Sequence, residues 1–459
     1  MRTIAIIGSG QTGLLAAHGL RKAGYSVTLY SDRKPEAWLS ASRPTGTAGR
    51  LALSLAYERE LGLDHWEAGA PKVGGAHLTF CPAMGNRLLT ATGRLKEHGL
   101  AIDLRLQSHQ WMLDLVDRGG KIEIEEVTIP KLEEIAREHD LTLVATGKGA
   151  LSSLFPRDET RSVYTKPQRH VTMICIQGPK LGIDGIPFMP FKFNLLADAG
   201  EAFWIPYHHK DIGPSWNCLF EAKPGGPMDR FGGAKSAKEA LDIARAVMKD
   251  LIPWDAPWFE DVEISDELGW LVGAVTPAIR NPVGKLPSGR AVMALGDAAM
   301  TIDPIAGQGA NNGNKMARNL VERAVAHGDR PFDEAWMTDT FERFWARHGQ
   351  HSNRWTNMLL EPPSSTAKAY LVAQYGSDGR PGRTDPAQRL ADAFAENFND
   401  PALLTDTFLD DARLRAFVRK QTGSFLGAVA KGVPGILRAQ LRQRLGKDPG
   451  HPFVATTAA

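Results

Sequence analysis

Residues 3–13 read Thr-Ile-Ala-Ile-Ile-Gly-Ser-Gly-Gln-Thr-Gly, a short apolar run that leads into three glycines. A fully apolar run of this length is typical of a strand buried inside a parallel sheet. A helical pattern follows from Leu14 to Ala23, and Ser26–Tyr30 returns as a second strand. A strand, a glycine turn, a helix and a strand within about 30 residues predict one βαβ unit, the start of an α/β fold.

The three glycines have separate functions in this prediction. Gly8 permits the tight turn, Gly10 lets the backbone approach a pyrophosphate, and Gly13 lets the helix pack closely on the strand. The helix N-terminus offers free N–H groups and a positive dipole end to the phosphates. We therefore predict a dinucleotide-binding cradle that also includes Gln11 and Thr12. A glycine turn in an unrelated α/β protein is the alternative.

The end of the second strand is the expected position of a ribose ligand. An acidic residue about 20 residues beyond the cradle commonly binds a ribose hydroxyl. Here the strand ends at Ser31, followed by Asp32 and Arg33. Ser31 can bond a ribose hydroxyl, and Asp32 can do so if the strand runs one residue longer; a solvated turn at 32–34 is the alternative. The cradle alone does not distinguish FAD from NAD.

A second glycine-rich segment follows an apolar strand at residues 290–295. The Asp297 carboxylate can accept hydrogen bonds from a ribityl chain, and the N–H groups of the helix that follows can face the electron-rich end of a reduced flavin. Gly307 and Gly309 let backbone lie flat against that ring. Together with the cradle, this segment predicts FAD; a strand, turn and helix with a capping Asp is the alternative. The predicted contacts are Gly296, Asp297, Pro304, Gly307, Gln308, Gly309, Ala310 and Asn311.

Gly-Asp-x-Ala followed by Pro-x-x-Gly-Gln-Gly-x-Asn resembles the flavin motif of the hydroxylases with the para-hydroxybenzoate hydroxylase fold. It resembles more closely the oxygenase component of styrene and indole monooxygenases. The resemblance extends over roughly residues 1–401, and it is carried further by residues 30–35, 145–148, 166–169, 354–357 and 396–399.

The resemblance implies a two-component FAD-dependent monooxygenase. In that family a separate reductase makes FADH2 from NADH. The oxygenase binds FADH2, forms a flavin C4a-hydroperoxide with O2 and transfers one oxygen atom to an alkene or an indole. The sequence contains no second glycine cradle for NADH, which is compatible with this arrangement. Arg105 and Gly147 match positions that the resemblance assigns to the flavin.

No side chain is expected to act as a general acid or base, because the flavin supplies the chemistry and the protein fixes the substrate and excludes water. The positioning residues are expected to be Gly46, Pro304, Gly307 and Gln308. The predicted pocket for an apolar aromatic substrate is lined by Gly46, Ala48, Val73, Phe191, Phe203, Ile205, Thr276, Pro277 and Ala306. Core packing is the alternative for the aromatic members. The histidine pair His208-His209 is expected to occupy surface or packing positions, and a catalytic function is the alternative for it.

One position departs from the family pattern. Styrene monooxygenases carry Asn and indole monooxygenases carry Ser at the position of Gly46. Nearby, Val73 is closer to the indole group, whereas Ala48 and Arg50 match neither group. A glycine leaves more room and removes a hydrogen-bond donor, so we expect a different or larger substrate.

Changes in pattern along the chain predict its organisation. β-rich runs separated by Pro and Gly clusters between residues 160 and 290 indicate an antiparallel sheet, and helical patterns dominate from about residue 330. We predict a Rossmann-like FAD-binding domain at 1–160 and 285–330 with an excursion around 70–100, a β-rich substrate domain at 161–284, and a helical region at 331–459.

The chain continues for about 60 residues beyond the part that the resemblance covers. Residues 426–445 mix basic and apolar side chains at helical spacing. A helix folded back on the body is the favoured interpretation, and a membrane-surface or partner-docking helix is the alternative. Gly432 and Pro434-Gly435 predict that this helix is broken.

The amino-acid composition argues against several classes of partner and site. A net charge of +2 gives no reason to expect a nucleic acid partner. The cysteines Cys81, Cys175 and Cys218 lack pairing or ligand spacing, so neither disulfides nor a metal site is predicted. No window is long and apolar enough for a membrane span. We expect a cytoplasmic protein that does not bind a membrane and that can form a homodimer.

Two further function classes remain open. One is a single-component hydroxylase that takes hydride directly from NAD(P)H, and the other is a non-catalytic flavin-fold binding protein. A flavin halogenase is disfavoured, because residues 201–206 read Glu-Ala-Phe-Trp-Ile-Pro rather than the Trp-x-Trp-x-Ile-Pro of that class.

Overall fold

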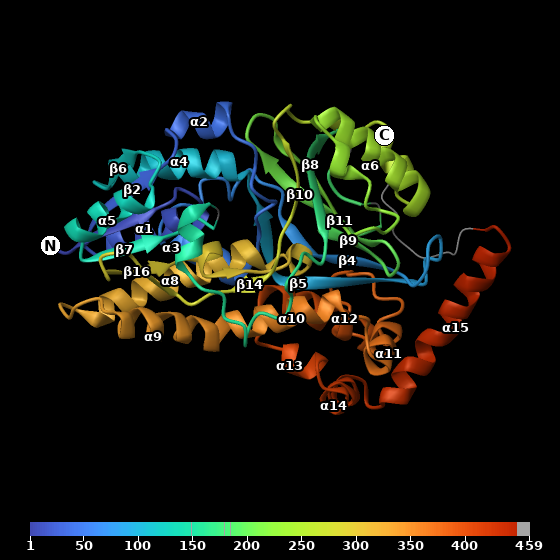
Figure 1. The fold of residues 1–459 in the computed structure, drawn as a ribbon. Helices are drawn as coiled ribbons and strands as arrows, with labels where there is room; N and C mark the ends of the chain where they lie inside the picture. The colour runs from blue at the N-terminus through green and yellow to red at the C-terminus, as the bar shows by residue number, and fades with distance from the viewer. Residues whose placement is uncertain (148, 179, 184, 448–459) are drawn as a thin grey trace. The chain divides into compact units, whose positions relative to one another are not determined.

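The computed structural model describes residues 1–147, 149–178, 180–183 and 185–447 (Figure 1). Lys148, which the resemblance includes, and the end of the tail at 448–459 lie outside these ranges. The chain forms two units, each assembled from separate segments. Unit 1 comprises Met1–Glu67, Ile102–Pro167 and Val275–Asn353; unit 2 comprises Ala68–Ala101, Gln168–Ala274 and the residues from Arg354 onward.

Unit 1 is built on a mostly parallel sheet with the strand order β15, β16, β7, β1, β2, β6, in which β15 pairs antiparallel with β16. The strands are β1 (Thr3–Ile7), β2 (Ser26–Ser31), β6 (Lys121–Ile124), β7 (Leu141–Val144), β15 (Val283–Lys285) and β16 (Ala291–Ala294). β1 and β7 are neighbours in the middle of the sheet. Their Ile, Leu and Val side chains are buried on both faces and form the centre of the apolar core.

Helices complete unit 1, and several begin at a side chain that caps them. Asp103, Thr128 and Asp333 accept hydrogen bonds from N–H groups in the first turns of α4, α5 and α9. The helices are α1 (Gln11–Lys22), α2 (Pro35–Ser40), α3 (Ala52–Glu60), α4 (Leu104–Asp117), α5 (Ile129–Glu138), α8 (Gln308–His327) and α9 (Glu334–Phe344). Shorter elements are β3 (Gly49–Arg50), η1 (Ala150–Leu154), β14 (Ala278–Ile279), η3 (Gly296–Ala298), β17 (Met300–Thr301), η4 (Pro304–Ala306) and η5 (Trp345–Gly349).

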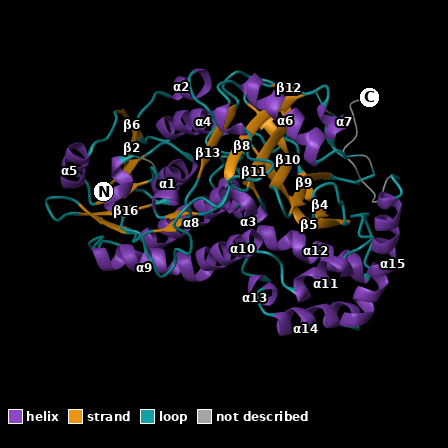
Figure 2. Cartoon of the chain, turned by 45° about the vertical axis from the view of Figure 1, so that its right-hand side comes forward, coloured by secondary structure: helices purple, strands orange, loops and turns teal. Residues whose placement is uncertain are grey.

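Unit 2 contains a largely antiparallel sheet in which β12, β8, β11, β10, β9, β4 and β5 follow one another and β13 also pairs with β8 (Figure 2). Only the β4 and β9 pair is parallel among these neighbours. The strands are β4 (Val73–Cys81), β5 (Leu89–Ala101), β8 (His170–Gln177), β9 (Met189–Leu196), β10 (Gly200–His209), β11 (Gly213–Ala222), β12 (Glu263–Ile264) and β13 (Trp270–Ala274). The predicted β-rich runs at 170–177, 202–207 and 216–222 lie within β8, β10 and β11.

The two faces of this sheet pack against different helices. Because side chains alternate along a strand, Trp204 and Phe203 point to opposite faces. Trp204 joins an apolar cluster with Trp258 of α7 (Ala256–Phe259) and with α6 (Ala237–Leu251). Phe193, on the face of Phe203, contacts Phe398 of α12 (Pro386–Asn399). The remaining elements of unit 2 are η2 (Phe231–Gly233), α11 (Ser365–Ala373), α13 (Thr405–Phe408), α14 (Asp411–Thr422) and α15 (Phe425–Arg444), and α10 (Gln350–Leu360) runs from unit 1 into unit 2.

The structure corrects the predicted break in the tail, because α15 is one helix with Pro434 inside it. A Cβ at Gly432 would overlap the Val372 carbonyl of α11, and one at Gly435 would overlap the Tyr375 ring. The two glycines therefore allow close helix packing instead of ending the helix, and that packing offsets the hydrogen bond that Pro434 removes. α15 folds back on α11, as the favoured interpretation expected.

The fold class predicted from the sequence is confirmed: a parallel nucleotide-type sheet, an antiparallel sheet and a helical C-terminal region. Helix α3 begins at Ala52, directly after the short strand β3 and Leu51. Among the described residues, no helix has the length and apolar character needed to cross a membrane.

Candidate functional site

Three turns meet at the carboxyl ends of β1, β7 and β16. A Cβ at Gly8, after β1, would lie 3.2 Å from the backbone of Ala145, after β7. One at Gly147 would lie 2.7 Å from Cβ of Asp297, after β16. Ligands of open α/β sheets bind at such strand ends, next to the point where the strand order reverses. The predicted cradle and the predicted second segment are therefore one site in space.

One group of glycines in this site, which we call the packed glycines, has no room for a side chain. A Cβ at Gly13 would overlap the Gly8 carbonyl, and one at Gly313 would overlap Thr12 Oγ1. A Cβ at Gly147 would likewise overlap Cβ of Asp297. These residues are glycines because α1, α8 and the strand ends touch one another directly.

A second group, the open glycines Gly10 and Gly309, has free space around it. Apart from the adjoining residues and the helix's own backbone, no protein atom lies within 4 Å of a Cβ at either position, and neither has a positive φ. The protein itself therefore gives no steric reason for glycine there. A bound group that lies against the backbone does give one, so this surface fits a nucleotide at Gly10 and a flat ring at Gly309.

The second segment presents backbone and one carboxylate to this surface. Asp297 is exposed, whereas residues 292–296 before it are buried. Gly307 has φ +60 and caps α8, so the first N–H groups of that helix follow a left-handed turn that favours glycine. Gln308 is buried, and its Nε2 donates to the Ala306 carbonyl at 3.0 Å.

A buried polar network connects the loop before α3 to the start of α8. Asn311 Oδ1 accepts the Leu51 N–H at 2.9 Å, and its Nδ2 donates to the Gly49 and Gly307 carbonyls at 3.0 and 2.7 Å. The predicted flavin contact Asn311 thus also holds the loop that carries Gly46.

The network continues through a buried ion pair. Arg50 Nε lies 2.5 Å from Glu58 Oε1, both side chains are almost fully buried, and burial raises the pKa of Glu58. Asn314 Nδ2 donates to the same carboxylate at 2.7 Å, and Gln11 of the cradle donates to Asn314 Oδ1. The sequence singles out Arg50, because it matches neither the styrene nor the indole group. Glu58 and Asn314 had no sequence signal, because only their burial distinguishes them from surface residues.

Arg50 also holds an unusual backbone conformation. Its Nη1 donates to the Ala48 carbonyl at 2.7 Å, and Ala48 is the non-glycine residue of the described chain with positive φ, at 49°. Such a conformation in alanine is strained and persists only where neighbouring groups hold it. The segment with Gly46 and Ala48 is therefore fixed to the flavin segment within unit 1.

The predicted ribose position shows a closed turn. Strand β2 ends at Ser31, so Asp32 lies outside it. Ser31 Oγ lies 2.7 Å from Ser9 Oγ and donates to the Arg33 carbonyl at 2.7 Å. Asp32 is exposed and pairs with Arg33 at 2.6 Å, and this bond lowers the pKa of the carboxyl.

Arg105, which the resemblance assigned to the flavin, is fully buried in unit 1. It pairs with Asp103 at 2.8 Å at the start of α4, and Asp103 also caps that helix through the Arg105 N–H. Fixed in this way, the guanidinium has little rotational freedom.

Three predicted substrate residues of unit 2, Phe191, Phe203 and Ile205, lie on the face of the sheet that packs against α12. The Phe193 and Phe203 ring centroids are 4.0 Å apart, and the Phe191 and Phe398 centroids are 5.3 Å apart. Ile205 is only half buried on the same face. Trp204, a neighbour in sequence, fills the opposite core and is separated from this group.

The other predicted pocket residues are divided between the units. Val73 is buried at the start of β4 in unit 2. In unit 1, Thr276 is half buried, Ala306 is buried, and the Pro277 carbonyl accepts from Arg157 Nη1 at 2.9 Å. Unit 1 thus holds Gly46, Ala48, Thr276, Pro277 and Ala306, and unit 2 holds Val73, Phe191, Phe203 and Ile205.

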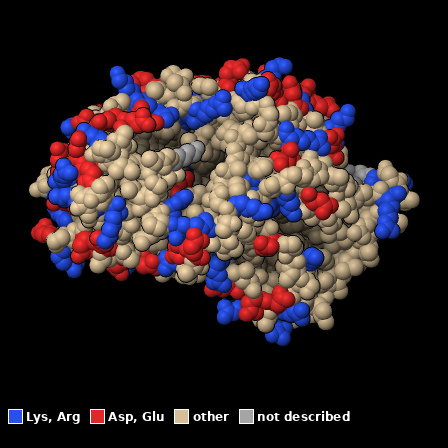
Figure 3. Space-filling view, viewed as in Figure 1, with Lys and Arg blue, Asp and Glu red and all other residues tan. Residues whose placement is uncertain are grey.

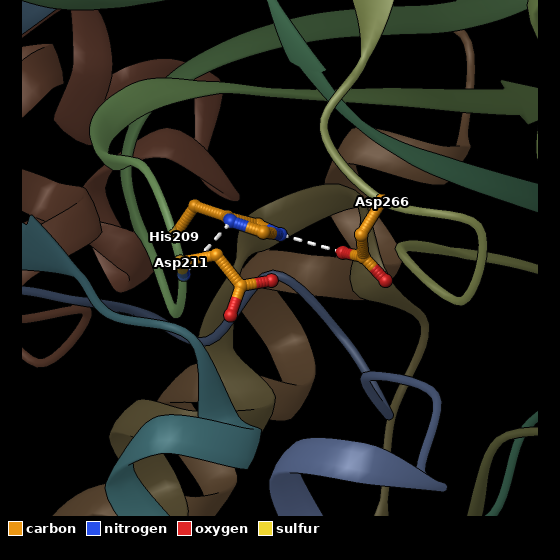
Figure 4. A group of neighbouring side chains, drawn as sticks. All are labelled: His209, Asp211 and Asp266. Carbon is orange, nitrogen blue, oxygen red and sulfur yellow. Dashed lines mark hydrogen bonds and ion pairs between the residues drawn. The ribbon is translucent and has the colours of Figure 1, made fainter.

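One group of potential metal ligands occurs in the described residues. His209, Asp211 and Asp266 have ligand atoms within 4.8 Å of one another (Figure 4). The His209 Nε2 lies 2.6 Å from Asp266 Oδ2, and its Nδ1 accepts the Asp211 N–H at 3.2 Å. Both ring nitrogens are therefore engaged, and the group connects the turn after β10 to the loop after β12.

Comparison with known proteins identifies what this chain resembles. Residues 147–257 match a family model described as "Styrene monooxygenase A putative substrate binding domain". The styrene monooxygenase StyA of Pseudomonas fluorescens is 28% identical over 426 residues, which cover 90% of this chain and 96% of that protein. A StyA from a Pseudomonas sp matches to the same extent. The expected resemblance to the oxygenase component of styrene monooxygenases is confirmed.

Solved structures share the fold. The flavin-dependent brominase Bmp2 matches with a TM-score of 0.61 and 15% identity over 90% of this chain and 99% of that chain. The p-nitrophenol 4-monooxygenase PnpA from Pseudomonas putida matches with a TM-score of 0.53 and 15% identity, also over 90% and 99%. At these identities the likeness establishes a flavoprotein-type fold, and the relatives in sequence support an FAD-dependent monooxygenase.

Proposed function

We propose that this protein is an FAD-dependent monooxygenase that transfers one oxygen atom from O2 to an apolar aromatic substrate of the alkene or indole type. The observation that carries the proposal is the open glycines Gly10 and Gly309, which leave backbone exposed where a flavin nucleotide fits. The similarity to StyA over 90% of the chain supports the reaction class.

The residues of unit 1 would hold the cofactor through backbone groups. The N-terminus of α1 would bind the phosphates, the Asp297 carboxylate would accept hydrogen bonds from the ribityl hydroxyls, and the N-terminus of α8 would stabilise the electron-rich end of the ring. When bound in reduced form, the flavin supplies the oxygen-activating chemistry. The protein then has to position the substrate and exclude water.

A separate reductase is proposed as the source of reduced flavin, because the chain resembles the oxygenase component of styrene monooxygenases. The sequence, which contains no second nucleotide cradle for NADH, is compatible with this arrangement. Styrene, indole and larger indoles are the substrates to test first, since Gly46 differs from both subfamilies and has open space around its Cβ.

The test mixes the purified chain with FAD, NADH and O2, with or without a general NADH:flavin reductase, and measures oxygenated products by chromatography. We expect product only when the reductase is present. Rapid flavin reduction by NADH alone would instead support a single-component hydroxylase. Flavin binding without product from any substrate of the panel would support a non-catalytic binding protein.

A further inference from the structure

Helix α15 belongs to the part of the chain that the family resemblance does not include. One side of this helix is fixed to unit 2. Ile436 and Ala439 are buried, Ile436 packs with Leu89 and Ala91 of β5, and Gln443 donates to the Gly85 carbonyl in the turn after β4. The helix therefore has a defined orientation, and its other side faces solvent.

The solvent-facing side carries a stripe of large apolar residues. Leu426, Val433, Leu437, Leu441 and Leu445 are 77%, 39%, 59%, 59% and 62% exposed. From Val433 on, they recur every four residues, so they lie on one side of the helix, away from Ile436 and Ala439. Scattered exposed leucines are ordinary on a surface, but a continuous row of them indicates a surface that is covered in use.

Basic side chains flank this stripe. Lys431, Arg438, Arg442 and Arg444 lie on α15, Lys447 follows it, and no acidic residue occurs in 425–447. The visible side of α15 in the space-filling view is accordingly tan and blue (Figure 3). A helix with an apolar stripe, a basic flank and no acidic residue has the character of an interfacial membrane helix.

We propose that α15 docks unit 2 on an anionic lipid surface. The leucines of the stripe enter the boundary between headgroups and acyl chains, while the basic residues contact the negatively charged headgroups. α15 does not qualify as a spanning helix, so it lies in the plane of the interface. An anionic bilayer fits better than a protein partner because every charged residue of 425–447 is basic and the stripe is uniformly aliphatic. The proposal is independent of the proposed oxygenation.

The test measures binding of the full chain to sedimented vesicles of phosphatidylcholine alone or mixed with phosphatidylglycerol. We expect binding to the mixed vesicles only, and weaker binding as salt increases. Leu437→Ser with Leu441→Ser should weaken binding at least about 10-fold. Lys431→Gln, Arg438→Gln and Arg442→Gln together should weaken it about 100-fold, since each basic residue contributes about fivefold.

Matched controls separate this surface from general effects. Leu403→Ser with Leu409→Ser removes exposed leucines outside α15, and Lys238→Gln with Lys249→Gln removes exposed charges on α6. Both controls should bind mixed vesicles like the parent, and thermal unfolding should be unchanged in all variants. Absence of binding to mixed vesicles, or equal binding by the α15 leucine variant, would overturn the proposal. A change of mass in light scattering on substituting those leucines, without vesicle binding, would instead assign the stripe to a second copy of the chain.

Discussion

The packed and the open glycines lie in the same candidate site but differ in what surrounds them. A Cβ at Gly13 would overlap the protein's own backbone, whereas a Cβ at Gly10, three residues earlier, would meet no protein atom within 4 Å. In α8 the order along the chain is the same: Gly309 is open, and Gly313, four residues later, is packed against Thr12. The two helices therefore meet where Gly313 of α8 packs on Thr12 of α1, whereas Gly13 packs α1 on the turn after β1.

This difference separates two requirements that look alike in sequence. The packed glycines are needed for the protein to fold, because helix and strand backbones touch there. The open glycines are needed only if something outside the protein occupies the space. Substitutions in the two groups should therefore affect different measurements, and the following predictions use that contrast.

The largest effect is expected at a packed position. Gly13→Ala puts a methyl group into the Gly8 carbonyl, and neither α1 nor β1 can move away without disturbing the core between them. We expect a loss of about 3 kcal/mol in the free energy of unfolding of the flavin-free protein, the upper end of the usual cost of overpacking. Urea unfolding followed by circular dichroism measures it. A free energy of unfolding equal to that of the parent would show that Gly13 and the Gly8 carbonyl are not in contact.

Open positions should show the opposite behaviour. Gly309→Ala introduces a better helix former into α8 with space around it, so the flavin-free protein should be as stable as the parent or more stable by up to about 1 kcal/mol. FAD affinity should fall about 10- to 100-fold, because the methyl group occupies the space of the ring. Fluorescence titration with FAD measures the affinity.

Gly10→Ala should likewise weaken FAD binding with little change in stability, and Gly232→Ala provides the control. Gly232 is also open, but it lies in η2 of unit 2. Its substitution should change neither FAD affinity nor stability. If Gly309→Ala and Gly232→Ala had the same FAD affinity, the open glycines would not be a binding surface.

The stability of the protein should also depend on pH, through a buried histidine of α1. His18 is buried in α1; its Nε2 donates to the Trp111 carbonyl at 2.8 Å and its Nδ1 accepts from Arg118 at 3.2 Å. Burial lowers its pKa from 6.5 to about 4. The unfolded chain therefore takes up this proton first, so stability is lost as pH falls from 6.5 towards 4.

The expected loss between pH 7 and pH 5 is about 2 kcal/mol, given that one pKa unit corresponds to about 1.4 kcal/mol. Urea unfolding at both pH values measures it, and His18→Gln should show a smaller difference between them. An unchanged difference in that variant would assign the acid sensitivity to other groups.

The sequence was sufficient to locate the strands and glycine turns of the candidate site, because backbone geometry dominates there. Glycine spacing after an apolar strand has few structural solutions, so the cradle and the Asp297 segment could be located and joined. The distinction between Gly10 and Gly13 could not be predicted beyond the general motif, because it depends on how closely α1, α8 and the turn after β7 approach one another. Glu58 and Asn314 were missed for the same reason: a polar residue on a helix is ordinary until the structure shows it buried.

The tail is a region where prediction from local sequence was wrong. Local rules predicted that Gly432 and Pro434 end a helix, and in isolation they favour that outcome. Packing against Val372 and Tyr375 makes the small residues useful at those positions, so tertiary contacts determined the result. Local propensity is a weak guide wherever a helix has a close neighbour.

The smallest effect is expected at Gly46, which lies in the loop held by Arg50 and Asn311. Like Gly10 and Gly309, it has free space around it, so a substitution there should affect ligand binding and not folding. Nothing lies within 4 Å of a Cβ there and φ is not positive, so Gly46→Asn should change the free energy of unfolding by less than about 0.5 kcal/mol. The added side chain and its hydrogen-bond donor restore the group that styrene monooxygenases carry at this position. If the loop borders the substrate, relative activity should shift towards styrene and away from larger indoles by about 10-fold, the usual scale for a small change in pocket size. Competition assays with paired substrates measure this ratio directly. A ratio equal to that of the parent would place Gly46 outside the substrate pocket and leave the loop with a purely structural function.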